Sequence, residues 1–141
     1  MIILIMVKKI VIGKGKKKRK VPETYVPKEL SKSDKKKQIK SIVEKKERPK
    51  VDIKNKKSGW ITKFEKKYNK KITDKKWIND NLLKNKGQEL AIKKGMAAYY
   101  SSGSRPNQNA FSWSRARLAS VLMNGPARKV DKDIWEKYKV N

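Results

Sequence analysis

The sequence contains no cysteine and no histidine. The lack of cysteine excludes disulfide bonds and zinc sites built on thiolates. The lack of histidine removes the commonest general base and the commonest ligand of transition metals. Apart from Asp131 and Asp133, which flank a lysine at an expected helix start, the 13 acidic residues are scattered singly. We therefore predict a protein that is not an enzyme and that uses no metal, cofactor or small-molecule substrate.

Long apolar runs are also missing. The run MIILIMV at 1–7 is far shorter than the about 20 residues that a membrane-spanning helix needs. It lacks the basic start and the small-residue cleavage site of a signal peptide. With Ile10–Ile12 it is rich in isoleucine and valine, which favours a β-strand that pairs with another strand, for example of a neighbouring chain. The alternative is a short anchor at a membrane surface, where the following lysines would attract anionic lipids.

Positive charge dominates the composition. Lysine and arginine number 40 against 13 acidic residues, so the formal net charge is +27. Such a charge opposes compaction and suits an anionic partner, which means nucleic acid, an acidic protein surface or a membrane. Lysines are in large excess, and a lysine suits diffuse phosphate contact, whereas an arginine suits planar, bidentate recognition. Most of the arginines lie in the last third of the chain, where we expect any contact that recognises shape.

The composition divides the chain into a basic arm over 1–57 and a helical domain over 58–141, with net charges of +15 and +12. Glycine, proline and like charges over 13–28 predict a linker. A helix with a thin apolar stripe is expected over 31–46, with Ser31 as its cap. The expected fold class is mainly α: a small helical domain with an extended basic N-terminal arm that carries a short strand and one thin helix.

The helices of the domain are predicted from the spacing of apolar residues and from capping residues at the helix ends. Trp60, Phe64 and Tyr68 recur at every fourth position, which predicts one buried aromatic face. The expected helices begin at Ser58 and Thr73, span 88–100 and 110–124, and begin again at Asp131. Gly125-Pro126 is expected to end the fourth helix, with the glycine as its C-cap.

The stretch YYSSGSRPNQ, which begins at Tyr99, contains no lysine and many turn-forming residues. Its serines lack a base that would activate a nucleophile. One interpretation is an anion-binding nest made by the backbone around Gly103, the serine hydroxyls and Arg105. The other, which we favour slightly, is a structural loop in which serine and asparagine side chains cap helix ends while Arg105 bonds to local carbonyls. We expect 99–122 to be the structural centre of the domain, with these side chains buried: Tyr99 or Tyr100, Phe111, Trp113 and Leu118.

Candidate contacts for an anion, a nucleic acid or a partner protein are the clustered lysines of the arm and the late arginines. They are Lys16, Lys17, Lys18, Arg19, Lys20, Lys35, Lys36, Lys37, Arg105, Arg115, Arg117 and Arg128. The string GKGKKK is not a phosphate-binding loop, because it lacks the four-residue spacer and the Ser or Thr after the lysine.

The residues from Gly95 to Trp135 resemble a family of short, lysine-rich proteins of nucleocytoplasmic large DNA viruses. The matching motifs are YYSSGSRPNQ, then Ser112-Trp113, ARLAS at 116–120, Asn124-Gly125 and KVD at 129–131. A second patch over 25–42 resembles the family's LSKKDKKKQ segment, so the resemblance covers about 25–137. Pro126 departs from the family, which has a second glycine there, and it stiffens the turn. The resemblance implies a viral origin and no catalytic residues.

We therefore expect a structural protein of a large DNA virus particle, a minor capsid or internal component that tethers neighbouring subunits through its basic arm. It would contact other capsid or virion proteins and lie in the virion, and in the host cell at sites of virus assembly. The alternative is a DNA-binding or DNA-condensing virion protein without sequence preference, which the charge supports. A ribosomal-type RNA-binding protein is a third hypothesis with the same charge.

Overall fold

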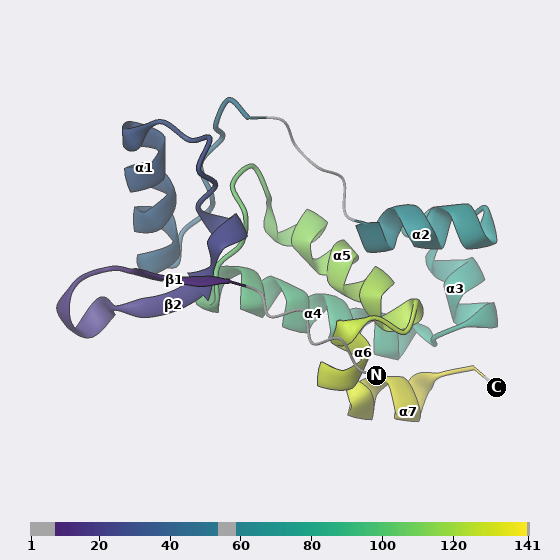
Figure 1. The fold of residues 1–141 in the computed structure, drawn as a ribbon. Helices are drawn as coiled ribbons and strands as arrows, with labels where there is room; N and C mark the ends of the chain where they lie inside the picture. Colours follow the sequence, from purple (N-terminus) through teal and green to yellow (C-terminus); the bar gives the residue numbers. More distant parts are fainter. Residues whose placement is uncertain (1–7, 54–58, 141) are drawn as a thin grey trace, which may run out of the picture. The chain divides into compact units, whose positions relative to one another are not determined.

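The computed structural model describes residues 8–53 and 59–140, and it is mainly α-helical (Figure 1). The chain forms two compact units. Unit 1 is Met1–Asn55 with Tyr100–Asn109, and unit 2 is Lys56–Tyr99 with Ala110–Asn141. The N-terminal part of the chain therefore forms a compact unit together with the loop at 100–109, whereas the sequence predicts this loop within the helical domain.

A β-hairpin opens unit 1. Strand β1, Lys9–Ile12, pairs antiparallel with β2, Arg19–Pro22, and Ile10 lies opposite Val21. The strand expected near the N-terminus is thus present from Lys9 and pairs within the chain, while residues 1–7 lie outside the described residues. The linker expected over 13–28 is wrong, because it contains β2 and two short 3-10 turns, Gly15–Lys17 and Glu23–Tyr25.

Helix α1, Lys32–Val43, is the other regular element of unit 1. The Ser31 hydroxyl accepts a hydrogen bond from the backbone N–H of Asp34 at 3.2 Å, so the predicted cap is confirmed. Ile42 is fully buried. It packs in a small apolar core with the hairpin, whose other buried members are Ile12, Val21 and Val26.

Unit 2 contains the remaining helices of the described chain. They are α2, Gly59–Tyr68; α3, Lys75–Asn81; α4, Asn85–Ser101; α5, Ala110–Leu122; α6, Pro126–Val130; and α7, Lys132–Tyr138. The aromatic face of α2 lies against the core as predicted, with Phe64 fully buried and its ring 5.2 Å from that of Tyr68. Helix α3 is capped by Asp74, not Thr73, because the Asp74 carboxylate accepts from the Trp77 N–H. The expected cap Ser58 lies outside the described residues.

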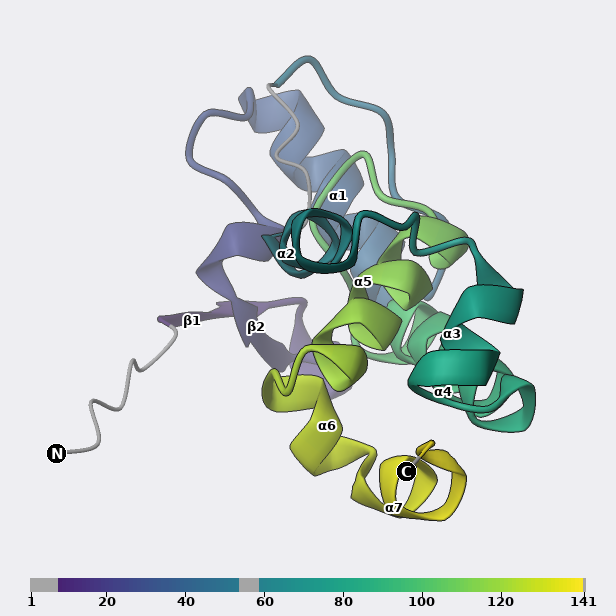
Figure 2. The same cartoon turned by 90° about the vertical axis from the view of Figure 1, so that its right-hand side faces the viewer.

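The turn after α5 differs from the prediction. Gly125 is the N-cap of α6 and Pro126 is its first residue, so this pair starts a helix where we expected only a stop. Asn124 takes the left-handed conformation, with φ of 58°, and the Gly125 N–H donates to the Ser120 carbonyl. Figure 2 shows α6 and α7 following one another along the chain.

Helix α5 also buries a different face from the one expected. Tyr99 and Leu118 are buried as predicted and Trp113 is half-buried, but Phe111 is 58% exposed, so its predicted burial is wrong. The buried stripe runs through Ala110, Ser114, Leu118 and Val121, and Phe111 lies one position beyond it. Small residues set this stripe, because a Cβ at Gly95 of α4 would lie 2.7 Å from the Ser114 Cα.

Candidate functional site

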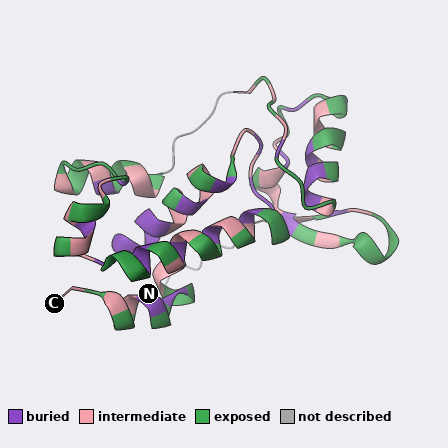
Figure 3. Cartoon of the chain, turned by 180° about the vertical axis from the view of Figure 1, so that it is seen from behind, coloured by how far each residue is buried: buried purple, intermediate pink, exposed green. Residues whose placement is uncertain are grey.

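The tip of the hairpin presents exposed lysines on a hydrogen-bonded turn. Lys14, Lys16, Lys17 and Lys18 are all exposed (Figure 3). The Lys17 N–H donates to the Lys14 carbonyl at 3.1 Å, and the Lys18 N–H donates to the Gly15 carbonyl at 3.3 Å. Gly13, with φ of 85°, makes the turn possible, because a Cβ there would collide with the Lys17 carbonyl oxygen. The ammonium groups therefore project from a defined frame.

The outer face of α1 carries a row of lysines. Lys32, Lys36 and Lys40 are exposed and spaced four residues apart, which is about 6 Å along a helix axis. The opposite face holds the buried Gln38 and Ile42. Because that face is buried, the row of lysines on the other face of α1 is directed toward solvent.

Charge effects connect the hairpin tip with the end of α1. Glu44 follows α1, and its carboxylate lies 3.0 Å from the Lys46 ammonium. The hydrogen bond from Lys46 lowers the pKa of Glu44, and the charges of Lys46, Lys40 and Lys17 lower it further. Lys17 at the tip and Lys40 on the helix thus lie close enough to act on one carboxylate. We call the following residues together the lysine surface: Lys14, Lys16, Lys17, Lys18, Lys32, Lys36 and Lys40.

The arginines of unit 1 bond to backbone carbonyls. The Arg19 guanidinium donates to the Ser101 carbonyl at 2.7 Å. Arg48 is buried and donates to the Ser41 and Lys46 carbonyls around the end of α1. Arg19, predicted as a contact with a partner, thus holds the hairpin to the loop.

Two predicted contact arginines of unit 2 are likewise engaged inside it. Arg128 donates to the carbonyls of Val121 at 2.8 Å and Leu122 at 3.0 Å, which are at the end of α5. Its guanidinium lies 3.8 Å from the centre of the Trp135 ring, and burial lowers its pKa. Arg117 makes a bidentate bond to the Asp131 carboxylate.

Asp131 is a buried carboxylate between α6 and α7, and it is 1% exposed. It accepts from the Arg117 Nε at 2.9 Å and from the second guanidinium nitrogen at 2.8 Å, while the Lys94 ammonium lies 3.7 Å away. The hydrogen bond to Asp131 raises the pKa of Arg117. Its carboxylate therefore joins α4, α5 and the α6–α7 turn instead of capping α7.

The loop at 100–109 is held by polar bonds to distant parts of unit 1. The Gln38 amide nitrogen donates to the Ser104 carbonyl at 2.9 Å and to the Tyr25 carbonyl at 2.8 Å. The Asn107 side chain accepts from the Val51 N–H at 2.6 Å and donates to the Val51 carbonyl at 3.0 Å. The Ser104 hydroxyl donates to the Arg105 carbonyl. These bonds favour the structural interpretation of the loop, although they connect remote segments and not helix ends.

The other predicted residues lie at separate places. Lys20 is exposed on β2 and Lys37 on α1, while Lys35 and Arg105 are half-buried. Arg115 is exposed on α5, one turn after the exposed Phe111. Lys14, Lys32 and Lys40 belong to the lysine surface but were not predicted. The four-residue spacing of Lys32, Lys36 and Lys40 is the signal that would have found two of them.

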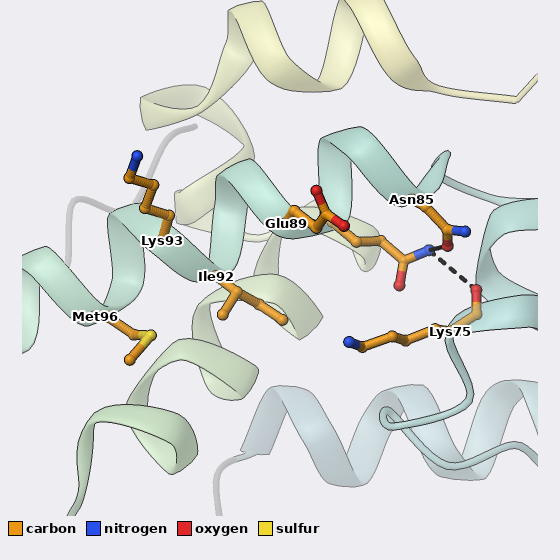
Figure 4. A pocket seen from close by; sticks show the side chains of 7 residues that line it. Lys75, Asn85, Glu89, Ile92, Lys93 and Met96 are labelled. Carbon is orange, nitrogen blue, oxygen red and sulfur yellow. Dashed lines mark hydrogen bonds between the residues drawn. The ribbon is translucent and has the colours of Figure 1, made fainter.

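Unit 2 also contains a cavity of about 310 Å³ between α4 and the start of α3 (Figure 4). Ile92 and Met96 line its apolar part, and Lys75, Gln88 and Glu89 line its polar part. Within 8–53 and 59–140, no cluster of acidic side chains could hold a metal ion. No helix in those two ranges is long and apolar enough to cross a membrane.

Comparison with protein families gives a match to a family of unknown function, DUF5824, over residues 16–134. The chain belongs to this family. The match includes the hairpin tip from Lys16, all of α1, the loop at 100–109 and α2–α6. No curated protein matches the chain. No solved structure matches it either. The DUF5824 assignment names no activity, and the viral origin stays a prediction.

Proposed function

We propose that this DUF5824 protein binds DNA without sequence preference, through the lysine surface of unit 1. The observation that carries the proposal is that these lysines stand on regular, hydrogen-bonded backbone. The tip lysines project from a hydrogen-bonded turn and the α1 lysines from a helix with a buried opposite face.

The chemistry of the surface favours the phosphate backbone over base edges. Lysine ammonium groups act as point charges, whereas base recognition commonly uses bidentate arginine. Arg19, Arg117 and Arg128 are engaged with carbonyls or with a carboxylate of their own unit. Binding would then follow from neutralised phosphates and released counterions, which gives strong dependence on salt.

A salt titration of binding to duplexes of unrelated sequence tests the proposal. With the seven lysines of the surface engaged, log K against log salt should have a slope of about −6. Two triple variants probe the two halves of the surface: Lys16→Ala, Lys17→Ala, Lys18→Ala and Lys32→Ala, Lys36→Ala, Lys40→Ala. Each should reduce the magnitude of the slope by about 2 to 3.

The matched control removes three exposed lysines of unit 2, as Lys66→Ala, Lys70→Ala and Lys71→Ala. It has the same loss of charge and should change the slope by less than about 1. An equal effect of all three variants would mean that net charge alone binds DNA. A wild-type protein whose affinity does not fall with salt would contradict the proposal altogether.

The role as a minor capsid or internal virion component stays a prediction. A tether would use an extended arm, whereas the described part of residues 1–57 contains a hairpin and a helix in one compact unit. For this reason we place the DNA-binding function first. Cross-links from Lys16–Lys18 and Lys36 in purified particles would separate the two roles, because DNA contacts should disappear in high salt and defined protein contacts should persist.

A further inference from the structure

The cavity of unit 2 combines an apolar wall with a cationic side chain. Ile92 and Met96 lie one turn apart on α4, and both side chains project to the side from which Lys75 approaches (Figure 4). The Lys75 side chain runs from the start of α3 toward Ile92, and Lys93 of α4 also lines the cavity. At about 310 Å³, the cavity is at the lower end of the range of small-molecule sites.

Gln88 supplies a fixed hydrogen-bond acceptor at this cavity. It is 2% exposed. Its amide nitrogen donates to the Leu83 carbonyl at 2.8 Å and to the Lys75 carbonyl at 3.1 Å. Since carbonyls only accept, these two bonds fix which end of the amide carries the nitrogen. The amide oxygen is buried and has no hydrogen-bond partner among the described residues.

A buried acceptor without a donor is costly, and a ligand that brings an N–H group would remove that cost. The same ligand would place an anionic group near the Lys75 ammonium and a ring or other apolar part against Ile92 and Met96. Excess lysine in the chain attracts phosphate compounds in particular. A nucleotide whose base carries an amino group has all three features: an N–H donor, a flat ring and a phosphate.

We propose that the α3–α4 cavity binds one nucleotide with an amino-bearing base, either free or at an unpaired position of a nucleic-acid strand. The base amino group donates to the Gln88 amide oxygen, its ring packs on Ile92 and Met96, and the phosphate lies near Lys75. For the strand source, the inference rests on the proposed nucleic-acid binding; for the free nucleotide it stands independently.

The first test follows methyl and amide NMR signals of the full chain during titration with adenosine 5′-monophosphate. We expect shifts of the Ile92 and Met96 methyl groups. Purine riboside 5′-monophosphate, which lacks only the amino group, should bind at least about tenfold more weakly, as should adenosine without phosphate. A cavity that holds only water would give no shifts with any of these compounds, and that result would overturn the proposal.

Variants separate this site from the lysine surface. Met96→Trp should fill the cavity and abolish the shifts while duplex binding and its salt slope stay unchanged. Lys75→Met should weaken nucleotide binding at least about tenfold, whereas its neighbour Lys76, exposed and not part of the cavity lining, provides the control Lys76→Met with less than a twofold effect. Equal effects of these two methionine variants would mean that the nucleotide binds through the general positive charge of the protein, and they would contradict a specific site in the cavity.

Single strands and blunt duplexes distinguish the two sources of the nucleotide. If a single strand displaces adenosine 5′-monophosphate and a blunt duplex does not, the site takes an unpaired nucleotide of a strand. If neither displaces it, the site takes a free nucleotide. Nucleotide binding without duplex binding would refute the proposed DNA-binding function and support the nucleotide site. Duplex binding without nucleotide binding would refute the nucleotide site and support the DNA-binding function.

Discussion

Unit 2 has an apolar core with aromatic side chains, whereas unit 1 has a smaller aliphatic core to which side-chain bonds to backbone carbonyls are added. In unit 2, Phe64, Ile78 and Leu118 form a core with aromatic rings around it. Among the described residues, the core cluster of unit 1 buries the aliphatic side chains of Ile12, Val21, Val26 and Ile42, with Tyr25 partly buried beside them. Unit 1 adds side-chain bonds to backbone carbonyls from Arg19, Gln38, Arg48 and Asn107.

This difference explains how a basic unit with a small core can present lysines to a partner. The polar side chains that hold unit 1 together are neutral amides or arginines bonded to backbone carbonyls. The lysines of the lysine surface are exposed, and burial of Ile42 and Gln38 on the opposite face orients those of α1. The residues that stabilise the unit and the residues proposed to bind DNA are thus separate sets.

The largest expected effect comes from the core of unit 2. Phe64→Ala should cost about 3 to 5 kcal/mol in free energy of unfolding, because it removes a fully buried ring and leaves a cavity. Hydrogen exchange resolved by residue should show the loss in α2–α5. Unit 1 should lose less protection against exchange. Its loop at 100–109 is the segment that connects α4 to α5, so we expect the loss in unit 1 to be confined to this loop. Equal loss in both units would mean that they unfold as one.

A smaller effect is expected from the buried amide of unit 1. Gln38→Met keeps the shape but leaves the Tyr25 and Ser104 carbonyls without their donor, which should cost about 2 kcal/mol. The loss of exchange protection should fall on α1 and the loop at 100–109. Gln88→Met is the matched change in unit 2, and its effect should stay within unit 2. If Gln38→Met leaves the stability of unit 1 unchanged, polar side-chain bonds do not stabilise unit 1 as this comparison states.

The smallest expected effect concerns pH. The pKa of Glu44 is lowered, chiefly by the hydrogen bond from Lys46, so its ionised form is favoured in the folded state. This contribution is present above the ordinary glutamate pKa and is lost as pH falls through the lowered, folded-state pKa. Urea midpoints of wild type and Glu44→Gln, compared across that range at low and high salt, should differ slightly at neutral pH and low salt and converge in acid. A difference that survives high salt would contradict an exposed ion pair.

The helices with strong local signals could be predicted. Ser31 caps α1 because its hydroxyl needs only the N–H of Asp34, and the aromatic period of α2 places Phe64 in the core. The hairpin was missed because its turn is made of lysine and glycine, which usually indicate a solvated linker. Helix α6 was missed because Gly125-Pro126 can end one helix and begin the next. The exposure of Phe111 follows from the close packing of Gly95 on Ser114. The local sequence around Phe111 does not indicate this contact.

The candidate sites were predictable only in part, and distance along the chain is the reason. Composition alone determined the positive charge and the lack of cysteine and histidine chemistry, and the periods and caps of the helices determined the mainly α class. Helix periods and caps are local, since each depends on residues three or four positions apart. Only the tertiary structure decided which cations and amides bond internally, because the Arg19–Ser101 and Gln38–Ser104 bonds join residues 82 and 66 positions apart. Such long-range pairing depends on the packed backbone, and it separates Arg19 from the exposed lysines of the hairpin tip.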